Sequence, residues 1–109
     1  MNLYNYFFPS KETYSRTSPY LVGNFKPVET ETSPTKVECY FGQVPEDLQG
    51  GLFLRTGPNP KYFPDGLYHW FDGDGFLHGV KFLKNNDISY CGRYVLTDRL
   101  IEVQGKQLL

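Results

Sequence analysis

The chain has 109 residues, which is enough for one small domain or for part of a larger one. Its 11 basic and 12 acidic side chains give a net charge of −1, which excludes the strongly basic surface that binds nucleic acid. The N-terminal segment lacks the basic start and long apolar run of a signal peptide, and no stretch is apolar enough to span a membrane. Cys39 and Cys91 have no metal-binding spacing, and we interpret them as free thiols of a cytoplasmic protein.

In chain order, residues 1–36 carry four prolines among many Ser and Thr residues, which predicts an extended N-terminal strap. Short apolar runs bounded by turn residues follow, and no segment has a helical period. The fold class expected is therefore all-β, as an antiparallel meander. The predicted strands are 36–43, 51–57, 67–71, 76–84 and 87–98, with another beginning at 100–103. Pro58 and Pro60 are expected to stop the second strand, and Asp72–Gly75 and Asn85–Asn86 are expected to form hairpin turns.

The stretch YHWFDGDGFLHG, residues 68–79, holds both histidines of the chain. A calcium loop fails here, because Phe76 falls where an oxygen ligand is required whichever aspartate begins the loop. A dinucleotide-binding loop also fails, because strand-like residues follow Gly75 where a helix is required. A hairpin turn fits best. Asp72 and Asp74 are expected to bind turn amides, and Gly73 and Gly75 to supply positive φ angles.

A simple hairpin register places Phe71 opposite Phe76 and His69 opposite His78. The two histidines then lie on one face, either as a hydrogen-bonded structural pair or as part of a metal site. The structural pair is favoured, because no cysteine or third histidine is near. A site of two histidines and one carboxylate would use Asp72 or Asp74.

Arg55 stands alone in an apolar strand. A cation in such a place usually pairs with a carboxylate or with backbone carbonyl groups. We prefer that structural role for Arg55 over substrate binding.

Four segments in this order resemble the N-terminal region of the carotenoid cleavage oxygenases. They are GNFKPV, VPEDLQGGLFLRTGPNPKY, YHWFDGDGFLHGVKF and RYVLTDRL. The resemblance runs from about residue 20 to about residue 101, and the combination of LRTGPNP with HWFDGDG is its most specific part.

The resemblance implies a seven-bladed β-propeller with a helical cap and a non-haem Fe(II) held by four histidines. The iron activates O₂, and a double bond of a carotenoid or apocarotenoid is split into two carbonyl products. It also implies an apolar tunnel that opens near a membrane-binding patch, and hence peripheral contact with a membrane.

Residue by residue, the four iron ligands of the family lie downstream of these motifs and are not in this chain. The aromatic ring of Phe71 matches a position that lines the substrate cavity. The family assigns structural roles to the matching motif residues Arg55, Gly57, Pro58, His69, Asp72, Gly73, Asp74, Gly75 and His78.

A propeller blade takes roughly 40–45 residues, so the chain is expected to hold the strap (1–36) and about one incomplete blade (37–109). We therefore expect a fragment of the dioxygenase that is inactive alone. An alternative is a short non-catalytic derivative of the family that binds an apolar ligand or another protein. A coincidental match in an unrelated small β domain is disfavoured by the paired motifs.

Overall fold

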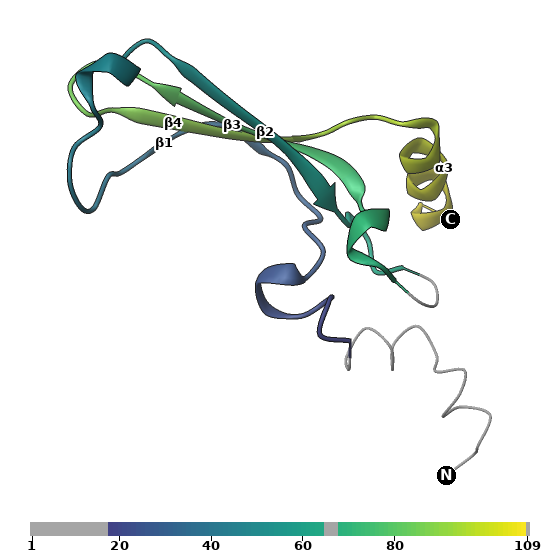
Figure 1. Cartoon of the computed structure of the whole chain (residues 1–109). Coiled ribbons are helices and arrows are strands. Elements are labelled where there is room, and N and C mark those ends of the chain that lie inside the picture. Colours follow the sequence, from purple (N-terminus) through teal and green to yellow (C-terminus); the bar gives the residue numbers. More distant parts are fainter. Residues whose placement is uncertain (1–17, 65–67, 109) are drawn as a thin grey trace. The chain divides into compact units, whose positions relative to one another are not determined.

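A computed structural model of the chain describes residues 18–64 and 68–108 (Figure 1). Residues 1–17 of the expected strap and residue 67 of the expected strand 67–71 lie outside this part. The elements are η1 (Gly23–Phe25), β1 (Thr32–Val37), η2 (Glu46–Leu48), β2 (Leu52–Asn59), η3 (Trp70–Asp72), β3 (Asp74–Phe82), β4 (Ile88–Tyr94) and α3 (Asp98–Gln107).

The chain divides into two units, each of which is described by itself. The first comprises Met1–Thr30 and Pro58–Asp74, and the second comprises Glu31–Gly57 and Gly75–Leu109. The first unit holds the motif turns that the sequence singled out. The second holds most of the sheet and the helix α3.

The strands form one four-stranded sheet in the order β1-β4-β3-β2. β3 and β4 are antiparallel, with Phe76 opposite Tyr94 at one end and Phe82 opposite Ile88 at the other. β1 runs antiparallel to β4 on its other side. The first strand of the chain is therefore an edge strand beside β4, outside the run β2-β3-β4.

The predicted turn at Asn85–Asn86 is confirmed. Both asparagines have positive φ angles, 60° and 63°, and the amide of Asp87 donates to the carbonyl of Lys84 at 3.3 Å. A two-residue turn with two positive φ angles has the twist that joins antiparallel strands, and asparagine tolerates this conformation. The side chain of Asn86 also accepts a hydrogen bond from the amide of Val44 at 2.6 Å, which fastens the connector 38–51 to the hairpin.

The predicted hairpin at Asp72–Gly75 is wrong. Residues 70–72 form a 3₁₀ turn, closed by the Asp72 amide on the carbonyl of His69 at 2.9 Å, and β3 begins at Asp74. The aromatic residues of 67–71 suggested a strand, but β3 pairs with β4 and neighbours β2 instead. The register that opposed His69 to His78 and Phe71 to Phe76 therefore does not exist.

The bounds of all four strands differ from the prediction, and β3 is Asp74–Phe82 instead of 76–84. The first strand is Thr32–Val37 instead of 36–43, so it begins within the expected strap. β2 continues through Pro58 to Asn59, because an edge strand tolerates a residue without an amide hydrogen. β4 ends at Tyr94, short of residue 98.

The predicted strand at 100–103 is wrong as well, because residues 98–107 are helical. The side chain of Thr97 accepts a hydrogen bond from the amide of Leu100 at 3.2 Å, which caps the first turn. Asp98 adds a favourable negative charge at the same end. These local interactions outweigh the strand preference of Ile101 and Val103.

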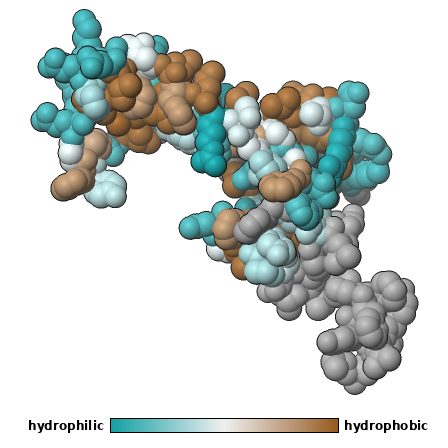
Figure 2. All heavy atoms as spheres, viewed as in Figure 1, coloured by the Kyte–Doolittle hydropathy of each residue, from teal (hydrophilic) through white to brown (hydrophobic). Residues whose placement is uncertain are grey.

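The buried core is small. In the second unit it is a cluster of Phe76, Tyr94 and Leu100, through which α3 packs beside the end of the sheet (Figure 1). In the first unit Leu21 is almost fully buried. Large apolar side chains remain open along the sheet, where hydrophobic residues gather in Figure 2, and Leu52, Phe53 and Leu54 of β2 are more than half exposed.

Candidate functional site

In the first unit, the two sequence motifs meet at Gly73. A Cβ atom at this position would lie 2.5 Å from the backbone nitrogen of Asn59 and 2.7 Å from the carbonyl carbon of Pro58. Gly73 has a φ angle of −69°, so the expectation of a positive φ there is wrong. Glycine is needed at this position because the backbone of the GPNP segment approaches it too closely for any side chain.

Asp74 joins the same two motifs through a hydrogen bond. Its Oδ2 atom accepts from the amide of Lys61 at 3.1 Å, so Asp74 binds an amide 13 positions away instead of an amide of the hairpin turn that the sequence predicted. No positive φ is found at Gly75 either. In the second unit, a Cβ atom built on Gly75 would lie 3.4 Å from the side chain of Val95, so this glycine also allows a close approach.

His69 has a local structural task. Its Nδ1 atom accepts a hydrogen bond from the amide of Phe71 at 3.1 Å and so caps the 3₁₀ turn. This bond requires an unprotonated Nδ1. The rings of His69 and Phe71 also lie against each other, 5.1 Å apart between centroids.

The turn presents the ring of Phe71 to the outside. Its side chain is 82% exposed. An apolar ring in this position contributes almost nothing to stability through burial, so its exposure is unusual for a phenylalanine. Within the described residues, His69 is the ring that contacts it. The cap by His69 and the close approach at Gly73 thus fix the backbone on either side of an open aromatic side chain.

His78 belongs to the second unit and to a different cluster. Its Nδ1 atom lies 2.8 Å from the hydroxyl oxygen of Tyr90, and its ring meets the ring of Phe76 at 4.8 Å between centroids. Gly92 lies opposite His78 in the ladder, and a Cβ there would lie 2.7 Å from the Phe76 ring and 2.9 Å from the Tyr90 hydroxyl. This cluster is a packed part of the sheet.

Arg55 is exposed, and its side chain has no hydrogen bond or ion pair with another residue of the described ranges. The partner expected for Arg55 thus stays a prediction.

The opposite face of the sheet carries an apolar groove of about 310 Å³. Its lining residues are Pro34, Leu52, Leu54, Leu77, Gly79, Lys81, Ser89, Cys91 and Arg93.

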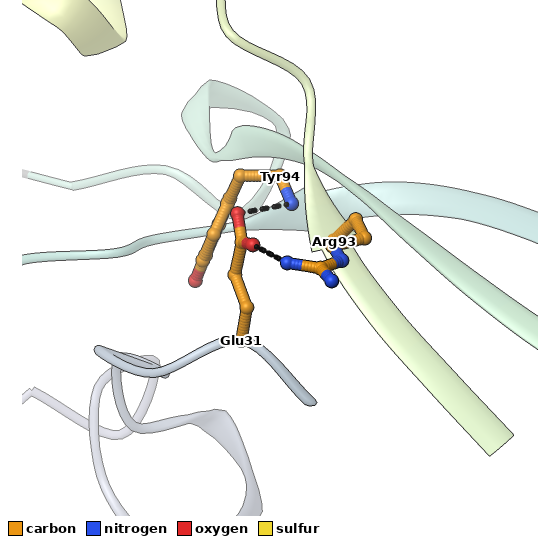
Figure 3. A network of polar contacts seen from close by, with 3 residues as sticks. All are labelled: Glu31, Arg93 and Tyr94. Atoms are coloured by element: carbon orange, nitrogen blue, oxygen red, sulfur yellow. Dashed lines mark hydrogen bonds and ion pairs between the residues drawn. The ribbon is translucent and has the colours of Figure 1, made fainter. Parts of the chain in front are cut away.

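Glu31 is a residue that no sequence motif singled out. Its carboxylate accepts from the guanidinium of Arg93 at 2.7 Å and from the amide of Tyr94 at 3.2 Å (Figure 3). The hydrogen bond and charge of Glu31, with a smaller contribution from Cys91, raise the pKa of Arg93 above its ordinary value. The only hint in the sequence is a charge at the start of a strand, which is common.

The residues present do not fit the iron site that the resemblance implies. Among residues 18–64 and 68–108, no three His, Cys, Asp or Glu side chains converge as metal ligands. The Nδ1 atom of each histidine is engaged, in His69 with a backbone amide and in His78 with the Tyr90 hydroxyl. Cys39 and Cys91 are free thiols, as predicted. Within the described ranges, no helix has the length and apolar character needed to cross a membrane.

Comparison with known proteins identifies the family to which these motifs belong. Residues 25–108 match the family described as retinal pigment epithelial membrane protein. A carotenoid 9,10(9',10')-cleavage dioxygenase of Crocus sativus is 49% identical over 86 residues, and one of Arabidopsis thaliana is 51% identical over 81 residues. The crystal structure of a Pseudomonas brassicacearum lignostilbene dioxygenase superposes with a TM-score of 0.65 at 31% identity, covering 84% of this chain and 19% of the other.

The chain belongs to the carotenoid cleavage oxygenase family. The Crocus match covers 79% of this chain but 15% of the relative, and the Arabidopsis match covers 74% and 15%. The chain thus spans a small part of the length of the curated relatives it matches.

Proposed function

We propose that this chain is part of a non-haem Fe(II)-dependent dioxygenase that splits a double bond of a carotenoid or apocarotenoid with O₂. The observation that carries the proposal is the 49% identity over 86 residues with a carotenoid 9,10(9',10')-cleavage dioxygenase. That level of identity extends across the motif turns and the sheet, so it is not the product of one short pattern.

The chain would supply the strap and about one blade of a seven-bladed propeller. The four-stranded sheet and its likeness to part of a lignostilbene dioxygenase support this role. The exposed apolar side chains of β2 and the groove on one face support it too, because a propeller blade buries both faces against its neighbours. Alone, such a sheet leaves its apolar surface in water.

The iron would be held by four histidines supplied by the rest of the longer protein, where it would activate O₂. Within this chain, the motif turn would hold Phe71 open toward the substrate cavity. The support is the exposure of its ring and the rigid backbone around it, built from the His69 cap and the close approach at Gly73. Peripheral contact with a membrane, where such apolar substrates dissolve, belongs to the same proposal.

A short non-catalytic derivative that binds an apolar ligand is the second candidate. The apolar groove of about 310 Å³ favours it, because its size and lining suit a small hydrophobic molecule.

Sequencing the transcript on both sides of the region that encodes residues 1–109 separates the two candidates. The first candidate expects an open reading frame that continues and adds four dispersed histidines. The purified longer protein should then convert a carotenoid or apocarotenal to aldehydes under air. A stop codon directly after Leu109 in a stable transcript would overturn the first candidate and favour the second.

A further inference from the structure

The 3₁₀ turn at residues 70–72 is held differently at its two ends. At the far end, a Cβ atom on Gly73 would lie 2.5 Å from the backbone nitrogen of Asn59, so the two backbones are in close contact. The next residue, Asp74, accepts a hydrogen bond from the amide of Lys61 at 3.1 Å. A contact between backbones involves no titratable group. The far end of the turn is therefore anchored by a contact that a change of pH does not remove.

The near end of the turn depends on one titratable side chain. The Nδ1 atom of His69 accepts a hydrogen bond from the amide of Phe71 at 3.1 Å, which requires the lone pair of an unprotonated nitrogen. Histidine is the side chain that ordinarily changes charge near neutral pH. A proton on Nδ1 would set two N–H donors against each other. The imidazole must then turn away, and the amide loses its partner.

The same movement removes the ring that lies against Phe71. The centroids of the His69 and Phe71 rings are 5.1 Å apart, and within the described residues this is the ring contact of Phe71. Because the Phe71 side chain is 82% exposed, other packing does little to hold it in place. The position of the Phe71 ring therefore depends on the charge of His69.

Three charged side chains lie on the segments around this turn. They are Asp72 in the turn itself, Asp74, and Lys61, whose amide binds the Asp74 carboxylate. Within the part of the chain that the structure describes, none of the three forms an ion pair or a hydrogen bond with His69. Among these residues, the amide of Phe71 is thus the polar partner that orients the imidazole.

We propose that His69 is a positioning residue, whose neutral imidazole holds Phe71 where it contacts the apolar polyene, and that acidification releases this ring and weakens substrate binding. The inference rests on the proposed function, because it takes Phe71 as part of the substrate cavity. The direction follows from competition between the proton and the amide for one lone pair. The cap is present when His69 is neutral and is lost as the pH falls.

The first arm of the test does not depend on activity. The 109-residue chain is labelled with ¹⁵N-phenylalanine, and the amide resonance of Phe71, assigned by its loss in Phe71→Leu, is followed by NMR from about pH 8 to about pH 5. We expect this resonance to shift in the wild type. In His69→Asn it should stay constant, because the side-chain carbonyl of asparagine can accept the amide two residues on and takes no proton. No shift in the wild type, or an equal shift in His69→Asn, would overturn the proposal.

The second arm uses the longer protein proposed above, with an apocarotenal as substrate. The KM of the wild type is divided by the KM of His69→Asn at each pH, so that the effects of other titrating groups cancel. This ratio should rise by about two- to fivefold from about pH 8 to about pH 5, the factor that an ordinary cap is worth, while kcat changes less.

A constant KM ratio, with the Phe71 amide responding to pH in the first arm, would overturn the positioning role. His69→Ala lacks the cap at every pH, so its KM should match that of the acidified wild type at low pH and exceed that of the wild type at high pH. Equal KM values for His69→Ala and the wild type at high pH would contradict the proposal as well. If the longer protein cleaved no polyene, the proposed function would fail, and the first arm would still decide whether the charge of His69 controls the turn.

Discussion

Glu31 joins Arg93 and the backbone of Tyr94 through the two oxygens of one carboxylate, at 2.7 and 3.2 Å (Figure 3). The contact lies one residue before β1, beyond the last ladder pair, Thr32 with Gly92. The Glu31 carboxylate thus accepts the hydrogen bond of the Tyr94 amide that the carbonyl group of a neighbouring strand would otherwise accept. Because the ring of Tyr94 packs in the core cluster, the carboxylate fastens the start of β1 to the residue that anchors the sheet on α3.

Glu31→Ala should lower the free energy of unfolding of the chain by about 1 kcal/mol, because the amide of Tyr94 loses its acceptor. Glu31→Gln keeps an acceptor oxygen and should cost less. The raised pKa of Arg93 means that its favourable contribution is present at every pH below its ordinary pKa and is lost only as the pH rises through the raised value. Urea unfolding at pH 7 and 10 should therefore give the same difference between wild type and Glu31→Gln. A difference that vanishes by pH 10 would contradict this account.

Gly73→Ala should destabilise the motif turn by about 1–3 kcal/mol, because its Cβ would lie 2.5 Å from the backbone of Asn59. Gly57→Ala is the matched control, since a Cβ at Gly57 meets nothing within 4 Å. Urea unfolding followed by the fluorescence of the single tryptophan, Trp70, measures both. If the two variants were equally stable, the close packing of Gly73 against the GPNP segment would be refuted.

Substitutions at two glycines of the second unit should act in opposite directions. Gly92→Ala forces a Cβ to 2.7 Å from the Phe76 ring and should destabilise the sheet by about 1–3 kcal/mol. Gly105→Ala lies in α3 with open space around it and should stabilise the helix by up to about 1 kcal/mol. Thermal unfolding monitored by circular dichroism gives both signs. A neutral Gly92→Ala would mean that the rings are not packed on this position.

In the longer protein proposed above, His69→Ala should leave the iron stoichiometry unchanged and cost about 1 kcal/mol through loss of the cap on Phe71. His69→Asn should recover most of that stability, because asparagine caps well. Metal analysis of the purified variants, combined with thermal unfolding, separates the two effects. Loss of iron from a folded His69→Ala protein would show that this histidine is a ligand.

The sequence predicted best where a local rule decides the structure. Two asparagines between alternating apolar runs predicted the turn at 85–86, because few residues other than glycine tolerate two positive φ angles. The family followed from motif residues whose order and type are specific.

The predictions failed where contacts between residues far apart in the sequence determine the structure. Residues 70–72 are rich in aromatics, yet they form a 3₁₀ turn beside a glycine that packs against the GPNP backbone. No local sequence pattern predicts that the backbone at Gly73 approaches the backbone of Pro58 and Asn59 so closely. For 100–103 the missed signal was local, since Thr97 and Asp98 are typical of a helix start. The role of Glu31 depends on a partner 62 positions away and had no visible signal.

The most direct test of the central claim is to produce residues 1–109 alone, add Fe(II), and offer a carotenoid and an apocarotenal under air. The chain has two histidines, neither arranged with other ligands in the described part, and its sheet faces stand open to water. Cleavage requires a fixed metal and a dry pocket that orients the polyene. We therefore expect no stoichiometric iron uptake and no aldehyde above a free-iron control. Iron bound in stoichiometric amounts, with aldehyde products above that control, would contradict the view that this chain is one part of a larger oxygenase.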